Sequence, residues 1–429
     1  MDLIVTIVFG VLFFALIMAS VALHEIGHMV PAKIFGVRVP KYFVGFGPTA
    51  WSTVRGETEY GIKWFPLGGF VRLLGMYPPG SPRQGQPTRL AELADAARAA
   101  EWEEITPTDV EDGRLFYQKK TWQKLVVMFG GPFMNLLIAF CLFWAVTAGY
   151  GVYRAQTTIA VVQECIIPAG ANRTECVDTD PRTPAHTAGL RAGDRVVSFN
   201  EVTITSYEQL SSLIRANLDG EARLVVERDG QQVALTPVHT VVNGVADTWD
   251  PSRRIAAGWL GVGPTQELTR GGPVQVAQDM ATLTGQSVVA LVQFPVKVWN
   301  VVADMVTGKP RDVNGPVSIV GASVVAGEVA AADVPWETKA VMFTSLLASV
   351  NLFLAIFNLV PLPPLDGGHM AGALWEWLRR RTARLRGRAD PGPFDTAKLL
   401  PVAYAVGGLL LLSGVALIIA DIVSPLQLF

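Results

Sequence analysis

The fold of this chain is decided by the stretch His24-Glu25-Ile26-Gly27-His28, which lies in the C-terminal part of a long apolar run. Two histidines four positions apart on a helix project from one face and can share a Zn²⁺ ion, and the glutamate between them can act as a general base. Each ionisable residue in a lipid-length helix costs about 2.5–3.5 kcal/mol at the centre of a bilayer. It is therefore not expected that three such residues are present in this helix without a function. A metal site would explain them, and such a site needs a further protein ligand.

The composition is that of a multi-pass membrane protein. Of the 429 residues, 50% are hydrophobic and only 17% are charged, which is little charge for one large soluble domain. The formal net charge of -2 is close to zero, so we do not expect nucleic acid as a partner.

Four apolar stretches are long enough to span a bilayer, which takes about 20 residues. We assign these spans to residues 1–34, 122–150, 341–378 and 397–422. The first span carries the histidine motif and has no basic region before it, so a cleaved signal peptide is not expected. Residues 265–335 contain an apolar run broken by Pro295. We interpret them as helices on the outer membrane surface, with a short re-entrant segment as the alternative.

Basic residues near the span ends predict the orientation. Arg38 and Lys41 open the connection 35–121, and an arginine-rich run at 379–388 follows the third span. Because basic connections are retained in the cytoplasm, we expect both of these connections to be cytoplasmic. Both termini and the large segment between the second and third spans are then extracytoplasmic.

The connection 35–121 contains a predicted β-hairpin followed by a linker with one short helix near 90–104. The alternation of large side chains up to Trp64, broken by Pro66 and paired glycines, is typical of a hairpin with a free edge. Such an edge can bind an extended peptide as an additional strand, although a plain surface hairpin has equal weight. The candidate substrate-binding residues in this hairpin are Gly61, Ile62, Trp64, Gly68 and Gly69.

Residues 155–242 have the composition of a soluble domain. The pattern predicts a strand at 195–200, a helix at 206–216 and strands at 222–228 and 231–237 around an Asp229-Gly230 turn. This order, and the string Ala-Gly-Leu-x-x-Gly-Asp that ends at Asp194, resemble a bacterial PDZ domain. Cys165 and Cys176 lie on the oxidising side of the predicted topology, so we expect a disulfide between them.

The candidate third ligand is Asp366, which lies in an apolar, proline-rich stretch from Asn358 to His369. Irregular backbone at membrane depth persists only against protein or a water-filled cavity. An aspartate there is costly unless it is paired or binds a metal. We therefore predict that Asp366 completes the zinc site, with His369 as the next candidate and a helix-capping role for Asp366 as the structural alternative.

Taken together, these motifs resemble the site-2 proteases, which are zinc metalloproteases that cut within membranes. The resemblance covers nearly the whole chain and is closest to the bacterial branch with PDZ domains, which cleaves membrane-bound anti-sigma factors. The residues that carry it are His24-Glu25-x-x-His28, Asn-x-x-Pro-x-Pro-x-Leu-Asp-Gly from Asn358, Gly45–Pro48, Gly131-Pro132 with Asn135, and Gly315-Pro316-Val317.

The resemblance implies a multi-pass α-helical membrane protein with four transmembrane helices, a cytoplasmic-side β-hairpin and an inserted α+β PDZ domain. His24, His28 and Asp366 would hold zinc, Glu25 would activate water, and Asn358 would help to hold the substrate. The substrates would be single-pass proteins in the bilayer of a bacterial plasma membrane, first trimmed by another protease. One departure is that the best-studied relatives carry two tandem PDZ domains, whereas this chain has room for one.

Two other classes of function fit part of the pattern. One is a non-catalytic membrane scaffold that contains a PDZ domain and a structural zinc, and an intact Glu25 argues against it because a structural site has no use for a base. The other is a metal transporter, which is disfavoured because the spans contain one acidic ligand and no repeated half.

Overall fold

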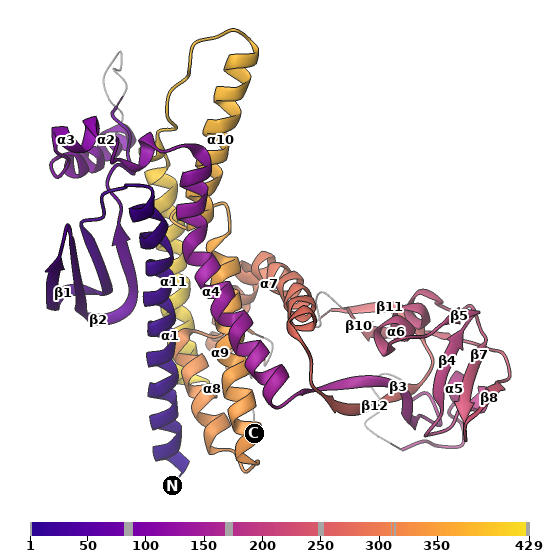
Figure 1. Ribbon diagram of the computed structural model, residues 1–429. Helices are drawn as coiled ribbons and strands as arrows, with labels where there is room; N and C mark the ends of the chain where they lie inside the picture. The colour runs from indigo at the N-terminus through magenta and orange to yellow at the C-terminus, as the bar shows by residue number, and fades with distance from the viewer. Residues whose placement is uncertain are drawn as a thin grey trace. The chain divides into compact units, whose positions relative to one another are not determined.

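The structure is a computed structural model that describes residues 2–80, 89–167, 175–247, 253–309, 311–312 and 315–425 (Figure 1). The chain forms two compact units. Unit 1 comprises Met1–Ala145 and Val276–Phe429, and unit 2 comprises Val146–Gln275. Unit 1 combines long apolar helices with a small sheet, and it contains all the residues of the predicted metal site.

Within the described part of the chain, five helical segments are long and apolar enough to cross a membrane. They are α1 (Asp2–Ile34), α4 (Thr121–Gly149), α7 (Pro273–Thr307), α9 (Trp336–Asn358) and the segment Thr396–Val423, which consists of η2 (Thr396–Leu399) and α11 (Leu400–Val423). The same unit also contains the short apolar helix α8 (Ile319–Ala331) and the arginine-rich helix α10 (Asp366–Leu385).

The break that the sequence showed at Pro295 does not end a helix, because α7 continues through Pro295 for 35 residues. The position of residues 265–335 on the outer membrane surface stays a prediction. A proline removes one N–H group and bends a helix, but packing can hold the helix together on both sides of it. Here Val298 and Val301 of α7 are buried against Leu417 and Ala420 of α11. Among the residues that the structure describes, five segments are thus candidate spans by length and composition, where the sequence predicted four.

Helix α8 also differs from the predicted surface helix, because it is buried against α1. Ala322 and Ala326 belong to one apolar cluster with Phe13 and Ile17 of α1. A Cβ atom on Gly327 would lie 2.9 Å from the carbonyl carbon of Thr6, so the two backbones approach each other closely. Small residues permit such close packing between helices in a membrane, and the hydropathy of α8 alone does not reveal it.

The predicted hairpin forms a sheet of β1 (Lys41–Arg55) and β2 (Thr58–Arg72). Both strands bend at glycines with positive φ, such as Gly45 at 91° and Gly68 at 83°. Residues 41–44 consequently pair on both sides, with 59–62 and with 69–72. The sheet lies beside the C-terminal half of α1 (Figure 1).

This pairing corrects one detail of the predicted substrate-binding edge. Gly61 pairs with both Phe43 and Ser52, and Ile62 is paired on both sides as well. Neither residue offers a free backbone edge in the described sheet. The edge nearest α1 is instead formed by residues 69–72, which include the predicted Gly69.

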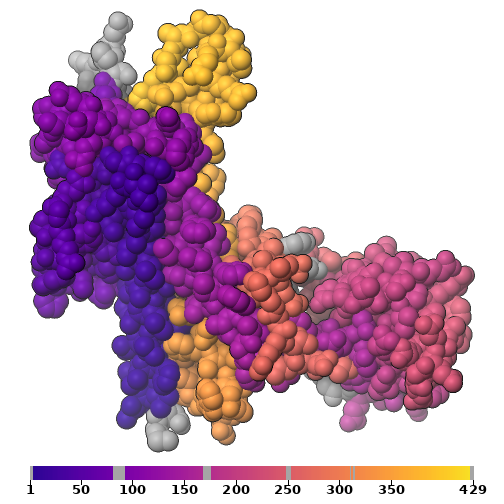
Figure 2. Space-filling model, in the orientation of Figure 1, coloured from indigo at the N-terminus to yellow at the C-terminus, as the bar shows by residue number. Residues whose placement is uncertain are grey.

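The predicted linker is more ordered than its composition suggests. It contains α2 (Arg89–Trp102), α3 (Pro107–Glu111) and η1 (Phe116–Gln118), which cover the end of α1 in the space-filling view (Figure 2). Arg98 of α2 is buried and pairs with Asp395 at 3.0 Å. Glu101 accepts a hydrogen bond from the amide of Met76 at 2.9 Å. These contacts attach the linker to the α10–α11 connection and to the chain that leaves the sheet.

Unit 2 is an antiparallel sheet with two short helices packed on it. Its main sheet has the order β12-β3-β4-β7-β8, with β5 on β4. Its elements are β3 (Val152–Val162), α5 (Pro184–Ala188), β4 (Arg195–Phe199), β5 (Val202–Thr203), α6 (Tyr207–Ala216), β6 (Glu221–Ala222), β7 (Leu224–Arg228), β8 (Gln231–Ala234), β9 (Val238–His239), β10 (Val241–Ala246), β11 (Arg254–Trp259) and β12 (Val262–Thr269).

The core of unit 2 lies where α6 covers the sheet. Leu210 and Ile214 of α6 pack with Phe199 and Leu224 of the strands in one buried cluster. The Asp229-Gly230 turn joins β7 to β8 with positive φ at both residues, as a tight hairpin turn requires. Cys165 and Cys176 form a disulfide in this unit.

Candidate metal centre

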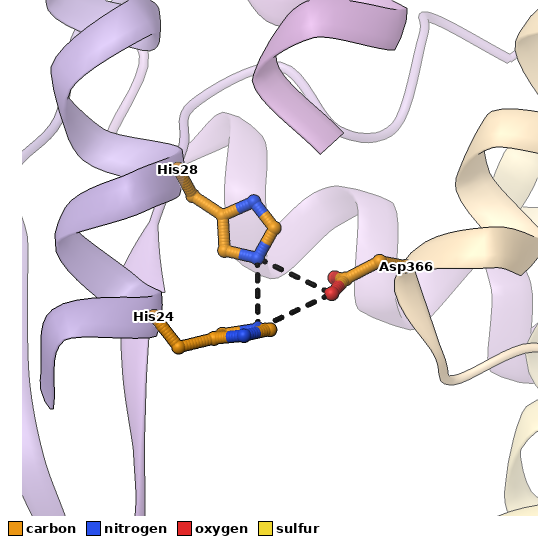
Figure 3. Close-up of side chains that lie close together, drawn as sticks. All are labelled: His24, His28 and Asp366. Carbon is orange, nitrogen blue, oxygen red and sulfur yellow. Dashed lines mark hydrogen bonds and ion pairs between the residues drawn. The ribbon is translucent and has the colours of Figure 1, made fainter. Parts of the chain in front are cut away.

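Helix α1 places His24 and His28 one turn apart on the same face, so both imidazoles point to the same side (Figure 3). Both side chains are buried, and their Nε2 atoms lie 3.2 Å apart. Two ring nitrogens that face each other in a buried site bring two lone pairs together unless a proton or a metal ion lies between them.

Asp366 reaches the same point from the other end of the chain. Its Oδ2 atom lies 3.3 Å from the Nε2 atom of each histidine, as the dashed lines in Figure 3 mark. The aspartate is the first residue of α10, and the proline-rich loop 359–365 folds back beneath it. A Cβ on Gly368 would lie 2.6 Å from the nitrogen of Pro363. The Asp-Gly-Gly sequence is thus required for the loop to turn tightly enough to deliver the carboxylate.

A backbone carbonyl determines which nitrogen of His28 faces the site. His28 Nδ1 lies 2.8 Å from the carbonyl oxygen of Val127 on α4. Since a carbonyl only accepts hydrogen bonds, Nδ1 carries the proton and Nε2 presents its lone pair toward Asp366. This is the usual arrangement of a metal-binding histidine, whose other ring nitrogen donates to an orienting acceptor.

Glycines on α4 provide the room for the two imidazoles. A Cβ on Gly131 would lie 2.6 Å from His24 Nε2 and closer still to His28 Nε2. One residue earlier, a Cβ on Gly130 would lie 2.7 Å from the carbonyl carbon of Gly27, so α1 and α4 approach backbone to backbone. The Gly130-Gly131 pair therefore both allows the helices to pack closely and leaves space over the histidines.

The three side chains fit a tetrahedral metal ion. Their ligand atoms all lie within 4.8 Å of one another, and the individual separations of 3.2–3.3 Å match the edge of about 3.3 Å expected for metal–ligand bonds of about 2.0 Å. Within the described residues, the buried Asp366 Oδ2 has no hydrogen-bond donor. Two imidazoles and one carboxylate form a donor set suited to zinc, and they leave a fourth position open.

The carboxylate of Glu25 faces the edge of the sheet. Its Oε2 atom accepts a hydrogen bond of 2.9 Å from the backbone amide of Val71. A Cβ on Gly69 would lie 3.3 Å from Glu25 Cγ, so the strand edge contacts this side chain directly. The segment that offers a free edge therefore also contacts the residue between the two histidines.

A buried ion pair that the sequence did not reveal fixes α10. Lys124 Nζ on α4 lies 2.9 Å from Glu376 Oε2 on α10, and the two side chains are only 5% and 4% exposed. Glu376 also accepts a hydrogen bond from the amide of Phe394. The signal available in the sequence was a single acidic residue just before the arginine run. Its partner could not be inferred because 252 positions separate the two residues.

The other predicted site residues lie outside this cluster. Asn358 is half-buried at the last position of α9, before the loop that leads to Asp366. His369 is not among the converging ligands and instead lines a cavity of about 450 Å³ together with Tyr77 and Tyr404. Trp64 is 69% exposed on the sheet.

Comparison with known proteins identifies the family of this chain. The model of peptidase family M50 matches residues 12–389. Zinc metalloprotease Rip1 of Mycobacterium tuberculosis is 36% identical over 443 residues, which are 98% of this chain and 98% of that protein. Zinc metalloprotease Rip1 of Mycolicibacterium smegmatis is 35% identical over 440 residues, with the same coverage. The chain therefore belongs to peptidase family M50, the site-2 proteases, which are intramembrane zinc metalloproteases.

Proposed function

We propose that His24, His28 and Asp366 hold the catalytic zinc and that Glu25 is the general base of an endopeptidase that cuts transmembrane segments. The observation that carries this proposal is the convergence of three buried ligand atoms from opposite ends of the chain, each 3.2–3.3 Å from the others. Zinc, when bound, supplies Lewis acidity toward a water molecule and toward the scissile carbonyl.

The residues of the chain contribute orientation and proton transfer. The Val127 carbonyl keeps the Nδ1 proton of His28 in place, so that Nε2 remains a ligand. Glu25 takes a proton from the attacking water and passes it to the nitrogen of the leaving amine. The Lys124–Glu376 pair holds α10, and therefore Asp366, against α4.

The substrate must be unwound before it can react, because a helical peptide bond is shielded by the hydrogen bonds of its own helix. We infer that residues 69–72 of β2 bind the unwound segment as an added strand, next to Glu25. What supports this is the free edge of the sheet and its contact with Glu25. Asn358 would hold the substrate on the side of α9.

We further propose that the substrates are single-pass membrane proteins such as anti-sigma factors, which another protease trims first. Unit 2 would be a PDZ domain that selects trimmed substrates rather than a catalytic unit. Its support is the strand and helix order β3, α5, β4, α6, β7, β8 and β12 around a single apolar core. Deletion of residues 180–240 should relax substrate selection and leave zinc bound, and loss of zinc from a folded deletion variant would contradict this role.

The proposed orientation in a bacterial plasma membrane has the arginine-rich end of α10 in the cytoplasm and the termini outside. In support, α1 begins and α11 ends at one end of the helices, whereas α10 projects from the other (Figure 1). Reporter fusions after Arg388 should behave as cytoplasmic, and fusions within 185–240 should behave as exported. The reverse pattern would overturn this orientation.

The activity is tested directly with purified protein in proteoliposomes and a fluorescently labelled single-pass peptide that contains a glycine-rich, helix-breaking centre. We expect cleavage that a chelator abolishes and that added zinc restores. Glu25→Gln should bind zinc without cleaving the peptide. Cleavage by Glu25→Gln at the wild-type rate would refute the proposed mechanism.

A further inference from the structure

We propose that the backbone amide of Val71 is a latch that holds Glu25 in the free enzyme, and that an extended substrate takes over this amide and thereby releases Glu25 for catalysis. This inference rests on the proposed function and adds a specific control of the base. Its starting point is the 2.9 Å hydrogen bond from the Val71 amide to Glu25 Oε2. A catalytic base bonded to the edge where substrate binds cannot be independent of substrate binding.

The pairing of the sheet determines which backbone groups face the substrate. Residues 69–72 pair without interruption with residues 44–41, and in such an antiparallel ladder successive residues point their N–H and C=O groups to alternate sides. The Val71 amide points away from the ladder, because it donates to Glu25. The Leu74 amide, three residues further along, points to the opposite side and donates to the Arg38 carbonyl at 3.1 Å. The outward residues of this edge are therefore Gly69 and Val71.

The absence of a side chain at Gly69 lets this edge lie close to α1. Gly69 has no side chain, and a Cβ there would meet Glu25 Cγ at 3.3 Å and Val21 Cγ1 at 3.6 Å. A strand added to this edge would use the outward groups of Gly69 and Val71 together. Its alignment would then require the Val71 amide to donate to a substrate carbonyl.

One amide hydrogen cannot serve both acceptors at full strength. A substrate carbonyl that accepts from Val71 must displace Glu25 Oε2, and the displaced, half-buried carboxylate is left with an unused acceptor. A carboxylate oxygen that is partly removed from water and lacks a donor is unfavourable, and in the proposed arrangement the available donor is the attacking water. The Val71 amide exchanges one acceptor for another and Glu25 exchanges one donor for another, so the net cost of moving the base is small.

The latch would let Glu25 distinguish an unwound substrate segment from a helical one. A helical segment has its own N–H and C=O groups paired internally, so it cannot take the Val71 amide from Glu25. An unwound segment can. The base is then free only when the chain lying along the edge is extended, which is the form that can be cut.

The test compares two inactive variants of the full-length zinc-loaded protein in detergent. Glu25→Gln keeps an oxygen that accepts from Val71, whereas Glu25→Ala has none. The probe is a fluorescent ten-residue peptide with N-methyl groups on alternate residues, so that only one edge can pair. Because a hydrogen bond contributes about 0.5–1.5 kcal/mol net, Glu25→Ala should bind the probe about 2- to 10-fold more tightly than Glu25→Gln.

The matched control removes the latch and leaves the sheet intact. Proline is tolerated on an edge strand where the N–H points outward, so each variant is also made with Val71→Pro. In that background the affinity difference between Glu25→Ala and Glu25→Gln should vanish. A difference that persists would reflect the size of the side chain and would overturn the proposal, as would equal affinities with Val71 intact or no binding by any variant.

Hydrogen exchange supplies a readout that does not depend on Val71→Pro. The Val71 amide should exchange slowly in Glu25→Gln, rapidly in Glu25→Ala, and slowly again when Glu25→Ala binds the probe. An amide that stays protected in free Glu25→Ala has another partner, and the latch is then refuted. Zinc content is measured on each variant, and peptide cleavage is measured on wild-type protein purified in parallel. Failure of the proposed function is then seen separately from failure of the latch.

Discussion

The substitution Gly131→Ala should remove zinc from a protein that still folds. The new Cβ would lie 2.6 Å from His24 Nε2, whereas ordinary contact begins at about 3.4 Å, so the ring must move by about 0.8 Å and that of His28 by more. Metal–ligand distances tolerate about 0.2 Å. Changes in the residues that only orient metal ligands already cost about 10- to 100-fold in affinity, so we expect at least 100-fold here.

The neighbouring glycine provides the contrast that makes this prediction specific. At Gly131 the obstacles are the far ends of two side chains, which can rotate away at little cost to the fold. At Gly130 the obstacle is the Gly27 backbone, which cannot move without separating α1 from α4. Gly130→Ala should therefore lower stability, whereas Gly131→Ala should mainly lower zinc affinity. Gly149→Ala, also on α4 but with nothing within 4 Å, is the control for the substitution itself.

The assay is competition for zinc against a chelator of known affinity, with unfolding in detergent measured on the same samples. The expected order of zinc affinity is wild type and Gly149→Ala equal, with Gly131→Ala far below both. Zinc affinity of Gly131→Ala within about threefold of wild type, with full proteolysis, would show that the glycine does not border the metal and would refute the geometry.

Two further predictions concern buried charges. Lys124→Met should lower the free energy of unfolding by about 1.5–3 kcal/mol, because it removes one charged hydrogen-bond donor from the buried Glu376, which keeps Arg380 at 3.4 Å and the Phe394 amide. Lys124→Met/Glu376→Met should recover most of this loss in a denaturant titration, and a loss below about 1 kcal/mol would contradict the prediction. In unit 2, burial raises the pKa of the Asp194 carboxyl, but hydrogen bonds from Arg228 and the Arg191 amide outweigh burial and lower that pKa below its usual value. Since the folded-state pKa is the lower one, this stabilisation is complete above the unfolded value of about 3.9 and is lost as pH falls below it. Pulse proteolysis in urea should show unit 2 weakening below about pH 4, and Asp194→Asn should lack that part of the pH dependence.

Local chemistry explains why much of the site could be read from the sequence. The spacing of His24 and His28 is a property of one helix, and the cost of a carboxylate in apolar surroundings singles out Asp366. The resemblance to the site-2 proteases rested in part on the same residues.

The features that the sequence did not predict depend on partners far away in the chain. Pro295 looked like a helix break because its stabilising contacts come from α11. Gly61 and Ile62 looked like an edge because the bend that pairs them on both sides is set by glycines elsewhere in the strands. The Lys124–Glu376 pair is a contact between two helices with no local signal in either. Local sequence patterns therefore predicted the helices, the hairpin and the candidate metal ligands. Tertiary packing determined which strand edge is free and which ion pair holds α10.

The most direct test of the central claim is the zinc stoichiometry of purified Asp366→Asn and Glu25→Gln, measured together with proteolysis. Asp366→Asn keeps the shape of the side chain and removes its charge, so zinc content and cleavage should fall together. Glu25→Gln should retain one zinc per chain and lose turnover, because only the base is changed. Full zinc and full activity in Asp366→Asn would place the third ligand elsewhere and contradict the convergence of His24, His28 and Asp366 on one metal.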